Sequence, residues 1–426
     1  MSKIYTPICS SYFGEKQMFE SQIVEKQSCR AQTKLANAAT VSTEGLDEYE
    51  IALCDQEESF RRLQSEWNEL LDHSACPVVF LKHQWMYTWW LVYGSRQTGT
   101  RLFILTARDA AKRLVGVLPL YLERLGRQPL ALRVLRLLGT ANEAPEYLDA
   151  IVHYQNSQRI LATLLATLAA RRSEYDALLL NDLSPKALLP AFLAGWSQTL
   201  GGVYENYTCS ICPYLKTTGE FDKFIQALST KHRYNFRRET RRLIEQRQVV
   251  FKVAADSEAV KSGLELLFIL HQQRWEGKGK KSQFDNESSH TFHRHLAVAL
   301  AGEGAARLYM LYCEHRPIAV FYCLCYNGQF FYYQSGLDAA FKNYSLGTVV
   351  IGKMIADCFA QNFYEFDFLR GNESYKFNWT NLTRPTSVCE VGLTTSAKLY
   401  FRFHHFYRHL KKRIRRLEAQ WCSARN

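Results

Sequence analysis

Apolar and polar residues alternate over short stretches of the chain and recur at three- and four-residue spacing over longer ones. Alternation predicts half-buried strands, and the longer spacing predicts helices with one apolar face. We expect the first strand at residues 49–53. A helix should follow over 59–71, with its apolar face formed by Phe60, Leu63, Trp67, Leu70 and Leu71. Residues 1–46 show neither period and are polar, so a flexible tail is expected there.

One pattern occurs twice. Residues 101–105 and 113–121 form two apolar stretches around a polar turn, and residues 307–311 and 316–322 do the same. In both pairs the second stretch begins with Arg, and in both helical sequence precedes and further strands follow. The repetition suggests two copies of one α/β domain, with chance similarity between two hairpins as the alternative.

The second copy has the clearer order of elements. Helices are expected at 257–275 and 288–301, and the hairpin and a strand at 329–334 follow. A long helix begins near Ser345, and the pattern ends with a strand at 366–369, a short helix and a strand at 387–393.

The C-terminal segment predicts an amphipathic helix, because large apolar residues recur there at helical spacing. They are Leu399, Phe403, Phe406, Leu410, Ile414, Leu417 and Trp421. Between Lys398 and Glu418 the segment holds eight Lys or Arg and one Glu. We expect it to pack on the second domain. The alternative is an in-plane contact with a membrane surface.

Length and composition are those of a globular protein of two domains: 426 residues, 47% hydrophobic and 22% charged. No run approaches the ~20 apolar residues of a membrane span, and no export signal is visible, so a cytoplasmic location is expected. The basic helix would allow peripheral contact with the inner membrane. The twelve cysteines are scattered without zinc spacing, which favours reduced thiols and no metal.

The net charge of +12 is concentrated in two places. One is the C-terminal segment, and the other is Lys231–Arg247, with seven Lys or Arg and two Glu. Such a segment can be a solvated helix face, line a cleft for an anionic ligand, or bind nucleic acid. Nucleic acid is the least expected of these, because no recognition module with a known docking mode is visible.

The segment 364–379, YEFDFLRGNESYKFNW, gathers the chemistry-bearing residues. A strand with alternating apolar residues ends there and is followed at once by ionisable and aromatic side chains. Strand ends of this kind build sites in α/β folds. The alternative is an ion pair between Asp367 and Arg370, with Tyr375 and Trp379 as core packing.

The chain resembles the tandem-GNAT acyltransferases of the CelD-like or BioF2-like branch, related to the Fem peptidoglycan aminoacyl-transferases. Three segments carry the resemblance: 331–338 (FYYQSGLD), 344–348 (YSLGT) and 366–379 (FDFLRGNESYKFNW). The basic segment from Lys231 to Leu243 is similar to the family's Arg-rich helix. The resemblance covers about residues 48–395.

The resemblance implies an α/β (α+β) fold of two tandem GNAT-like domains, each a mixed, mostly antiparallel sheet flanked by helices. The expected domains are 47–212, degenerate, and 213–395, with the acyl-CoA site; the tail (1–46) and the C-terminal helix (396–426) lie outside them. Acetyl-CoA or another acyl-CoA would be the co-substrate, with no metal.

In the family, acyl-CoA lies where two parallel strands diverge, and its pyrophosphate sits at the start of the next helix. The residues implied for the cofactor are Tyr333, Gln334, Ser335, Ser345, Leu346, Gly347 and Thr348. Gly347 would permit close backbone approach and Ser345 would cap the helix. The sequence departs from the family pattern at Leu346, where Pro is common, and lacks a basic residue within the loop. The assignment depends on an opening between the strands near Gln334 and Asp367.

For acyl transfer we expect Asp367 to act as base or amine anchor, with a pKa raised by burial. Arg370 and Lys376 would stabilise charge, and Tyr375 would protonate the departing thiolate. The acceptor residues are expected to be Glu146, Asp149, Glu373, Trp379 and Trp85. The alternatives are a plain ion pair for Asp367 with Arg370 and core packing for Tyr375, Trp379 and Trp85.

The predicted function is transfer of an acyl group to an amine or hydroxyl of a sugar or cell-envelope precursor. The family associates this with bacterial cellulose or exopolysaccharide production. Two alternatives stay open. One is an aminoacyl-tRNA-dependent, Fem-like transferase, in which the basic segment contacts phosphates. The other is a non-catalytic scaffold that docks on a synthase complex through the C-terminal helix.

Overall fold

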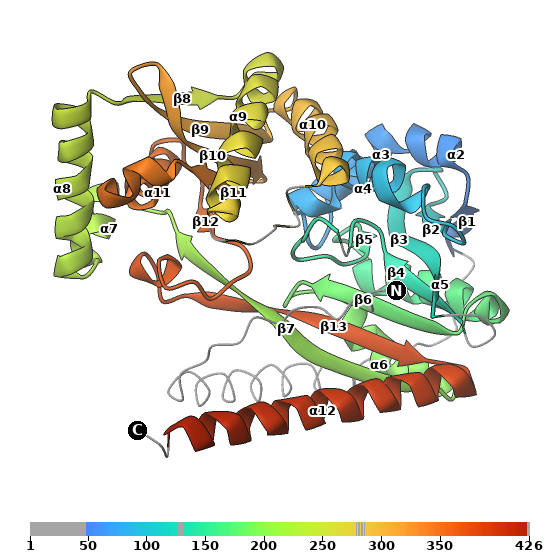
Figure 1. Ribbon diagram of the computed structural model, residues 1–426. Helices are drawn as coiled ribbons and strands as arrows, with labels where there is room; N and C mark the ends of the chain where they lie inside the picture. Colours follow the sequence, from blue (N-terminus) through green and yellow to red (C-terminus); the bar gives the residue numbers. More distant parts are fainter. Residues whose placement is uncertain are drawn as a thin grey trace.

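The computed structural model describes residues 48–423, apart from 127–130, 141, 278, 280–281, 283 and 285. The tail predicted at 1–46 lies outside the described residues. Figure 1 shows the chain as a broad twisted sheet with helices on both faces and one long helix beneath it. The first half contains β1 (Glu50–Cys54), α2 (Glu57–Arg62), α3 (Gln64–Asp72), α4 (His83–Trp89), β2 (Arg101–Arg108), β3 (Leu114–Leu125), β4 (Leu132–Leu137), β5 (Ile151–Val152), α5 (Ser157–Ala170), β6 (Ala177–Leu183), α6 (Leu189–Thr199) and β7 (Val203–Lys216).

The second half follows with helices and strands in the predicted order. They are α7 (Phe221–Ala227), α8 (Thr230–Arg247), β8 (Val250–Ala254), α9 (Ser257–Glu276), α10 (Glu287–Ala301), β9 (Ala306–Cys313), β10 (Arg316–Tyr326), β11 (Gln329–Leu337), η6 (Ala339–Tyr344), α11 (Leu346–Ala360), β12 (Glu365–Asp367), η7 (Lys376–Asn378), β13 (Thr383–Gly392) and α12 (Thr395–Ser423). The helix predicted at 59–71 is interrupted at Leu63, where ψ is −7°.

The described strands form one sheet in the order β1-β2-β3-β4-β6-β13-β7-β12-β11-β10-β9-β8, with β5 beside β3. The two repeated sequence patterns are antiparallel hairpins, β2–β3 and β9–β10. In each half one pair is parallel, β4 with β6 and β11 with β12. The prediction of a mixed, mostly antiparallel sheet flanked by helices is therefore confirmed.

The order of strands repeats between the halves, from β1 to β6 and from β8 to β12, but the strands that follow are exchanged. β13, from the end of the second half, pairs with β6 of the first half. β7, from the end of the first half, pairs with β13 along most of its length and with β12 at its last residues. The predicted domain boundary after residue 212 falls inside β7, so the sheet runs without a break from one half to the other.

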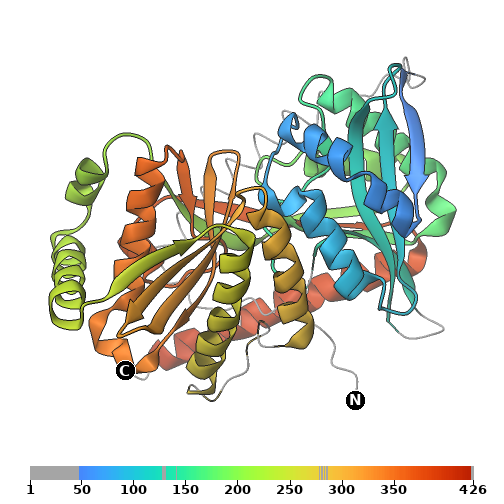
Figure 2. The ribbon, with the colours of Figure 1, turned by 90° about the horizontal axis from the view of Figure 1, so that it is seen from above.

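Helices cover the second half of the sheet on both faces. On one face, Leu264 and Phe268 of α9 and Phe292 of α10 pack with Tyr322 and Phe331. On the other face, Phe236 of α8 and Val350 of α11 pack with Phe321 and Phe330. Figure 2 shows α9 and α10 between the second-half sheet and the helices of the first half. The halves share one apolar core there, since the rings of Trp85 and Phe292 are 5.1 Å apart.

Helix α12 runs beneath the strands β7 and β13 (Figure 1). Ala397 and Phe401 are buried against Leu132, Val134 and Ala177, which belong to β4 and β6. The helix thus packs on strands of the first half, but it also lies against β13, where Arg408 pairs with Glu390 at 3.7 Å. The expectation that it packs on the second domain (213–395) is therefore confirmed only in part. Because β13 pairs with β6 of the first half, α12, which follows β13, begins next to β4 and β6. Among the described helices, none is both long and apolar enough to span a membrane.

Candidate active site

The parallel strands β11 and β12 pair over only three residues. Gln329, Phe330 and Phe331 lie opposite Glu365, Phe366 and Asp367. β11 then continues to Leu337, while the chain after Asp367 turns to β7, where the amide of Phe368 donates to the carbonyl of Pro213 at 2.9 Å. The two strands thus diverge beyond Asp367, as the resemblance implied.

β11 contains a bulge at the divergence. Gln334 lies opposite Tyr322, while Tyr332 lies opposite the next residue of β10, so Tyr333 is the extra residue. The Tyr333 hydroxyl donates to the carbonyl of Glu143 at 2.6 Å, and the Ser335 amide donates to the side chain of Gln334 at 3.0 Å. Bulges re-aim side chains beside active sites, and this one directs Tyr333 toward the first half.

Asp367 is fully buried at the end of β12. Its carboxylate accepts hydrogen bonds from the Tyr147 hydroxyl and from the Leu369 amide, each at 2.7 Å. Arg384 lies 3.6 Å away. Burial raises the pKa of Asp367 to about 6, although Arg384, Tyr147 and the Leu369 amide all act to lower it. The carboxyl group thus ionises near neutral pH, as a general base requires.

Arg370 contacts the first half and not Asp367. Its guanidinium donates to Glu146, to the Pro145 carbonyl at 2.5 Å and to Asp182 at 2.8 Å. The alternative of an Asp367–Arg370 ion pair is therefore wrong among the described contacts. Burial would lower the pKa of Arg370, but Asp182 and Glu146 outweigh it and hold that pKa well above its ordinary value. About a third of the Arg370 side chain (34%) stays exposed.

Glu146 is a buried carboxylate with one unused oxygen. Its Oε1 accepts from Arg370, and its Oε2 is buried without a hydrogen-bond partner among the described residues. Burial raises the pKa of Glu146, and Arg370 only partly offsets this. The acceptor role of Glu146 stays a prediction. Its position beside Arg370 places Glu146 within the same cluster as Asp367.

Lys376 holds the turn that follows β12. Its ammonium group donates to the carbonyls of Leu369 and Arg370, at 3.2 and 2.6 Å, and pairs with Glu373 at 3.0 Å. An ammonium group has three donors, and these contacts use all of them. The side chain is buried, so the arrangement favours positioning of the turn over the predicted stabilisation of charge on a substrate.

Tyr375 and Glu373 lie at the surface of the same turn. Tyr375 is 38% exposed, and Glu373 is more exposed still. Although part of the Tyr375 side chain is exposed, burial of the Tyr375 hydroxyl, with Tyr332 nearby, raises the pKa of Tyr375 above its ordinary value. A tyrosine that keeps its proton at neutral pH can donate it to a departing thiolate, which suits the predicted role.

Three residues predicted to bind the acceptor have structural positions instead. The Asp149 carboxylate accepts from the amides of Leu188 and Leu189, at 2.6 and 3.2 Å, and so caps α6. The Trp379 ring packs against His232 of α8, with centroids 4.4 Å apart. Trp85 has no exposed surface. The predictions that these three contact an acceptor are not supported, because none presents a surface to it.

Four residues around the cluster have left-handed backbone angles. Tyr147, Asp182 and Leu369 have φ angles of 63°, 59° and 56°, and Ala144 has 40°. Residues with side chains rarely adopt this left-handed region, and such strain persists where surrounding contacts hold it. Here the Asp367, Arg370 and Glu146 contacts supply that restraint.

The predicted phosphate loop is the start of α11. Ser345 precedes the helix with φ 47°, and its side chain makes no capping hydrogen bond, so the capping role predicted for it is wrong. The first amides of a helix have no partner within it. The amides of Leu346 and Gly347 therefore point out of the helix end, and at Gly347 the nearest atom to an added Cβ is 4.0 Å away. Leu346 is buried, and the Thr348 amide donates to the Ser345 carbonyl.

Helix α8 supplies the cations that the loop lacks. Arg247 donates to the Tyr344 hydroxyl at 2.8 Å, directly before the loop. The guanidinium of Arg242 lies over the Tyr344 ring, 4.9 Å from its centroid. The sequence showed that this segment is basic, but only the packing of α8 on η6 brings it to the helix end.

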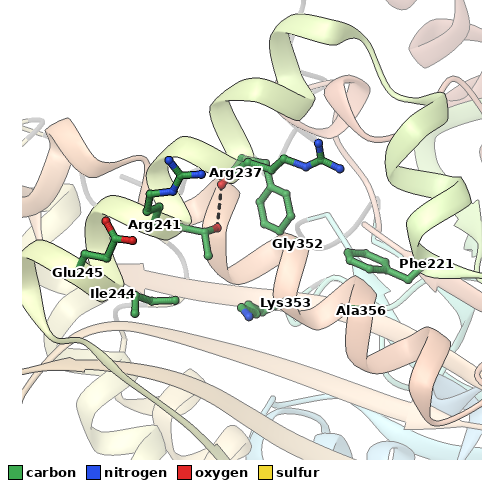
Figure 3. Close-up of a pocket in the computed structure, with 10 residues that line it drawn as sticks. Phe221, Arg237, Arg241, Ile244, Glu245, Gly352, Lys353 and Ala356 are labelled. Atoms are coloured by element: carbon green, nitrogen blue, oxygen red, sulfur yellow. Dashed lines mark hydrogen bonds between the residues drawn. The ribbon is translucent and has the colours of Figure 1, made fainter.

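A surface pocket of about 470 Å³ lies between α7, α8 and α11 (Figure 3). Arg237 and Arg241 of α8 and Lys353 of α11 are at its rim, and Phe221 and Phe236 contribute apolar lining. None of the residues predicted for catalysis or cofactor binding lines this pocket. It is a basic surface feature separate from the cluster around Asp367.

Sequence reasoning missed several residues of the cluster. Tyr147 contacts Asp367 and Asp182 contacts Arg370 from far away in the sequence, and Arg384 contacts Asp367 from the next strand, β13. Glu143 was also missed; its buried carboxylate accepts from Tyr93, from Ser289 and from His293. Tyr147 and Glu143 stand in the polar loop 139–149, which was the available signal.

Residues 230–377 match the sequence model of a family described as Acetyltransferase (GNAT) domain. The match lies within the second half of the chain. The matched range runs from α8 to η7 and includes Asp367, Arg370 and the start of α11. The predictions of an acyltransferase and of a GNAT-type fold are thereby confirmed. No curated protein matches the sequence.

Solved structures share the fold at low sequence identity. The crystal structure of FemX is 12% identical, with a TM-score of 0.56 over 82% of this chain and 98% of that one. L-PGS from Bacillus licheniformis is 10% identical, with a TM-score of 0.47 over 78% and 91%. A tandem GNAT protein from the clavulanic acid biosynthesis pathway is 13% identical, with a TM-score of 0.40 over 80% and 98%. At 12% identity the likeness to FemX concerns the fold alone.

Proposed function

We propose that this protein transfers an acyl group from a CoA thioester to an amine or hydroxyl of a sugar or cell-envelope precursor. The observation that carries the proposal is the divergence of β11 and β12 at Phe331 and Asp367, next to the open end of α11. A pantetheine arm between the strands would place the thioester beside Asp367. The pyrophosphate would lie at the amides of Leu346 and Gly347.

The chain's own residues supply the other requirements of acyl transfer. The acceptor nitrogen or oxygen attacks the thioester carbonyl, a C–N or C–O bond forms, and the C–S bond breaks. Asp367 takes the acceptor proton, and Tyr375 gives a proton to the CoA thiolate. Asp367 has no exposed surface, so the proposal requires the divergence of the strands to admit both the pantetheine arm and the acceptor.

Arg370 and the α8 arginines extend the site at its two ends. The exposed part of Arg370 would stabilise the oxyanion or hold an anionic group of the acceptor. Arg242 and Arg247, held at Tyr344, would neutralise the pyrophosphate. Among the residues predicted to bind the acceptor, Glu373 keeps an exposed carboxylate and remains in the proposal. The resemblance to the CelD-like or BioF2-like branch supports a glycan acceptor and a link to cellulose or exopolysaccharide production.

A second candidate is an aminoacyl-tRNA-dependent, Fem-like transferase. It is favoured by the exposed cations of α8, because no described residue pairs with Arg237 or Arg241. These arginines would neutralise tRNA phosphates and displace the counterions of the tRNA, so tRNA binding would weaken steeply as the salt concentration rises. A non-catalytic scaffold for a synthase complex is the third candidate, with α12 as its contact.

Native electrospray mass spectrometry of the full chain with acetyl-CoA tests the donor class. A bound CoA species is expected. Two matched variants locate the binding site. Arg247→Gln, near the loop, should weaken acetyl-CoA binding about tenfold, since hydrogen bonds to charged groups contribute about 1.5–3 kcal/mol. Arg237→Gln, at the separate pocket, should leave acetyl-CoA binding unchanged. Binding of tRNA but of no acyl-CoA would contradict the proposal and favour the second candidate.

Release of free CoA with a panel of amino sugars and sugar alcohols tests catalysis. The Asp367→Asn variant should bind acetyl-CoA normally but lose turnover by about 100-fold or more. If that variant keeps full turnover, Asp367 is not the base. If the host pathway also survives Asp367→Asn but fails on removal of residues 399–426, the scaffold candidate is favoured.

A further inference from the structure

Helix α12 exposes a continuous apolar stripe. Its residues recur at spacings of three and four and so share one face. Their exposed fractions are 50% for Leu399, 72% for Phe403, 67% for Phe406, 43% for Leu410 and 47% for Ile414. Tyr400 and Tyr407, at 41% and 55%, border the stripe. A contiguous apolar surface of this size on a globular protein marks an interaction site.

The opposite face of the same helix is fixed to the protein. Ala397 and Phe401 are buried in the cluster with β4 and β6. One turn or two further on, Arg408 lies over the Tyr207 ring, 3.6 Å from its centroid, and pairs with Glu205 at 2.9 Å. Residues two positions apart point to different sides of a helix, so these contacts direct Leu399, Phe403 and Phe406 away from the sheet.

Positive charge borders the stripe on both sides. Arg402 and Arg413 lie along one border and Lys411 along the other, and all three are exposed. From Thr395 to Ile414 the sequence contains no Asp or Glu. An apolar stripe with cationic borders is the arrangement of helices that lie in the plane of a membrane surface. The aromatic residues would enter the boundary between headgroups and acyl chains.

We propose that α12 is an in-plane membrane anchor that docks this protein on a bilayer containing anionic lipids. The described part of the stripe, from Leu399 to Ile414, corresponds to about 24 Å along the helix axis. Lys and Arg near an anionic surface each contribute about 1 kcal/mol, so three bordering cations add to the apolar attraction.

A second copy of the chain fits this surface less well. Two such stripes packed together would bring the borders of Arg402, Lys411 and Arg413 against one another, and no Asp or Glu lies between Thr395 and Ile414 to balance them. An anionic bilayer neutralises the same charges. The charge pattern thus selects lipid over self-association.

Cosedimentation of the full chain with vesicles tests the proposal. Vesicles of phosphatidylcholine with phosphatidylglycerol should bind it, and vesicles of phosphatidylcholine alone should bind it at least tenfold more weakly. The double variant Phe403→Ser, Phe406→Ser should lose binding. The double variant Arg402→Ser, Arg413→Ser should bind anionic vesicles about thirtyfold more weakly. Ile269→Ser, at a 52% exposed apolar residue of α9, is the matched control and should bind normally.

Three results would overturn the proposal. The first is that the full chain does not bind anionic vesicles. The second is that the Ile269→Ser control loses as much vesicle binding as the Phe403→Ser, Phe406→Ser variant. The third is that the Phe403→Ser, Phe406→Ser variant binds vesicles as well as the wild type does. Sedimentation equilibrium gives a further check: a dimer of the full chain that the two Phe substitutions dissociate would show that a second copy covers the stripe. Circular dichroism of each variant should match the wild type, which separates lost docking from lost folding.

Discussion

The Tyr147 hydroxyl donates a hydrogen bond of 2.7 Å to the Asp367 carboxylate, although 220 positions separate the two residues. The bond joins the loop of the first half to the strand end of the GNAT domain. Both groups are buried, so each satisfies a polar atom that water cannot reach. The candidate base therefore depends on both halves of the chain.

Replacement of Tyr147 by Phe should raise the pKa of Asp367 above about 6, because the hydroxyl acts to lower it. The acidic limb of the pH profile of kcat/KM should move to higher pH. Stability should fall by about 1–3 kcal/mol, since a buried carboxylate loses a donor. Urea denaturation measures this loss, with Tyr154→Phe at an exposed tyrosine as the control. An unmoved acidic limb would show that Asp367 does not set it.

Replacement of Arg370 by Gln should destabilise the fold by about 2 kcal/mol, because Glu146 and Asp182 lose their counter-ion. This value is below that for a fully buried pair, since a third of the Arg370 side chain is exposed. Adding Glu146→Gln should restore part of the loss. A double-mutant cycle by chemical denaturation measures the coupling. Additive effects of the two substitutions would mean that the pair contributes nothing.

Asp149 should make the fold more stable as pH falls. Burial raises its pKa from 3.8 to about 7. Between these values the folded state holds more protons than the unfolded state, so stability increases toward lower pH and is lost as pH rises toward 7. Asp149→Asn keeps a capping oxygen for α6 and should flatten this dependence, measured by melting temperature against pH. Asp222→Asn, a substitution at an exposed aspartate, is the control and should leave this pH dependence unchanged. A profile for Asp149→Asn as steep as the wild type would refute the assignment.

Two glycines, Gly336 in β11 and Gly347 in α11, should respond differently to substitution by Ala. A Cβ at Gly336 would lie 2.9 Å from the His271 amide nitrogen and 3.0 Å from the Leu267 carbonyl. Gly336→Ala should therefore push α9 from β11 and cost about 1–3 kcal/mol.

Gly347 has open space and lies in the first turn of α11, so Gly347→Ala should keep or raise stability, by up to about 1 kcal/mol. It should still weaken acetyl-CoA binding if the pyrophosphate lies against this backbone. Thermal melting and acetyl-CoA titration of both variants separate packing from binding. Unchanged acetyl-CoA affinity in Gly347→Ala would place the phosphates elsewhere.

The sequence alone determined the order of helices and strands from residue 257 onward. The strand predicted at 366–369 extends two residues beyond the observed end of β12 at Asp367. These features depend on residues that are neighbours in the chain, and alternation or helical spacing reports them directly. It also showed that Asp367, Arg370 and Tyr375 follow one another closely after this strand, since all three lie within a stretch of nine residues.

Only the tertiary structure decided which partners these residues have. Arg370 pairs with Glu146 and Asp182 rather than Asp367, because the exchange of β7 and β13 brings the loop of the first half against the GNAT strand end. Asp149 became a helix cap for the same kind of reason, since its partners belong to a distant turn. A local pattern cannot encode which distant backbone or charge will fill a side chain's hydrogen bonds. That choice is made by how the two halves pack.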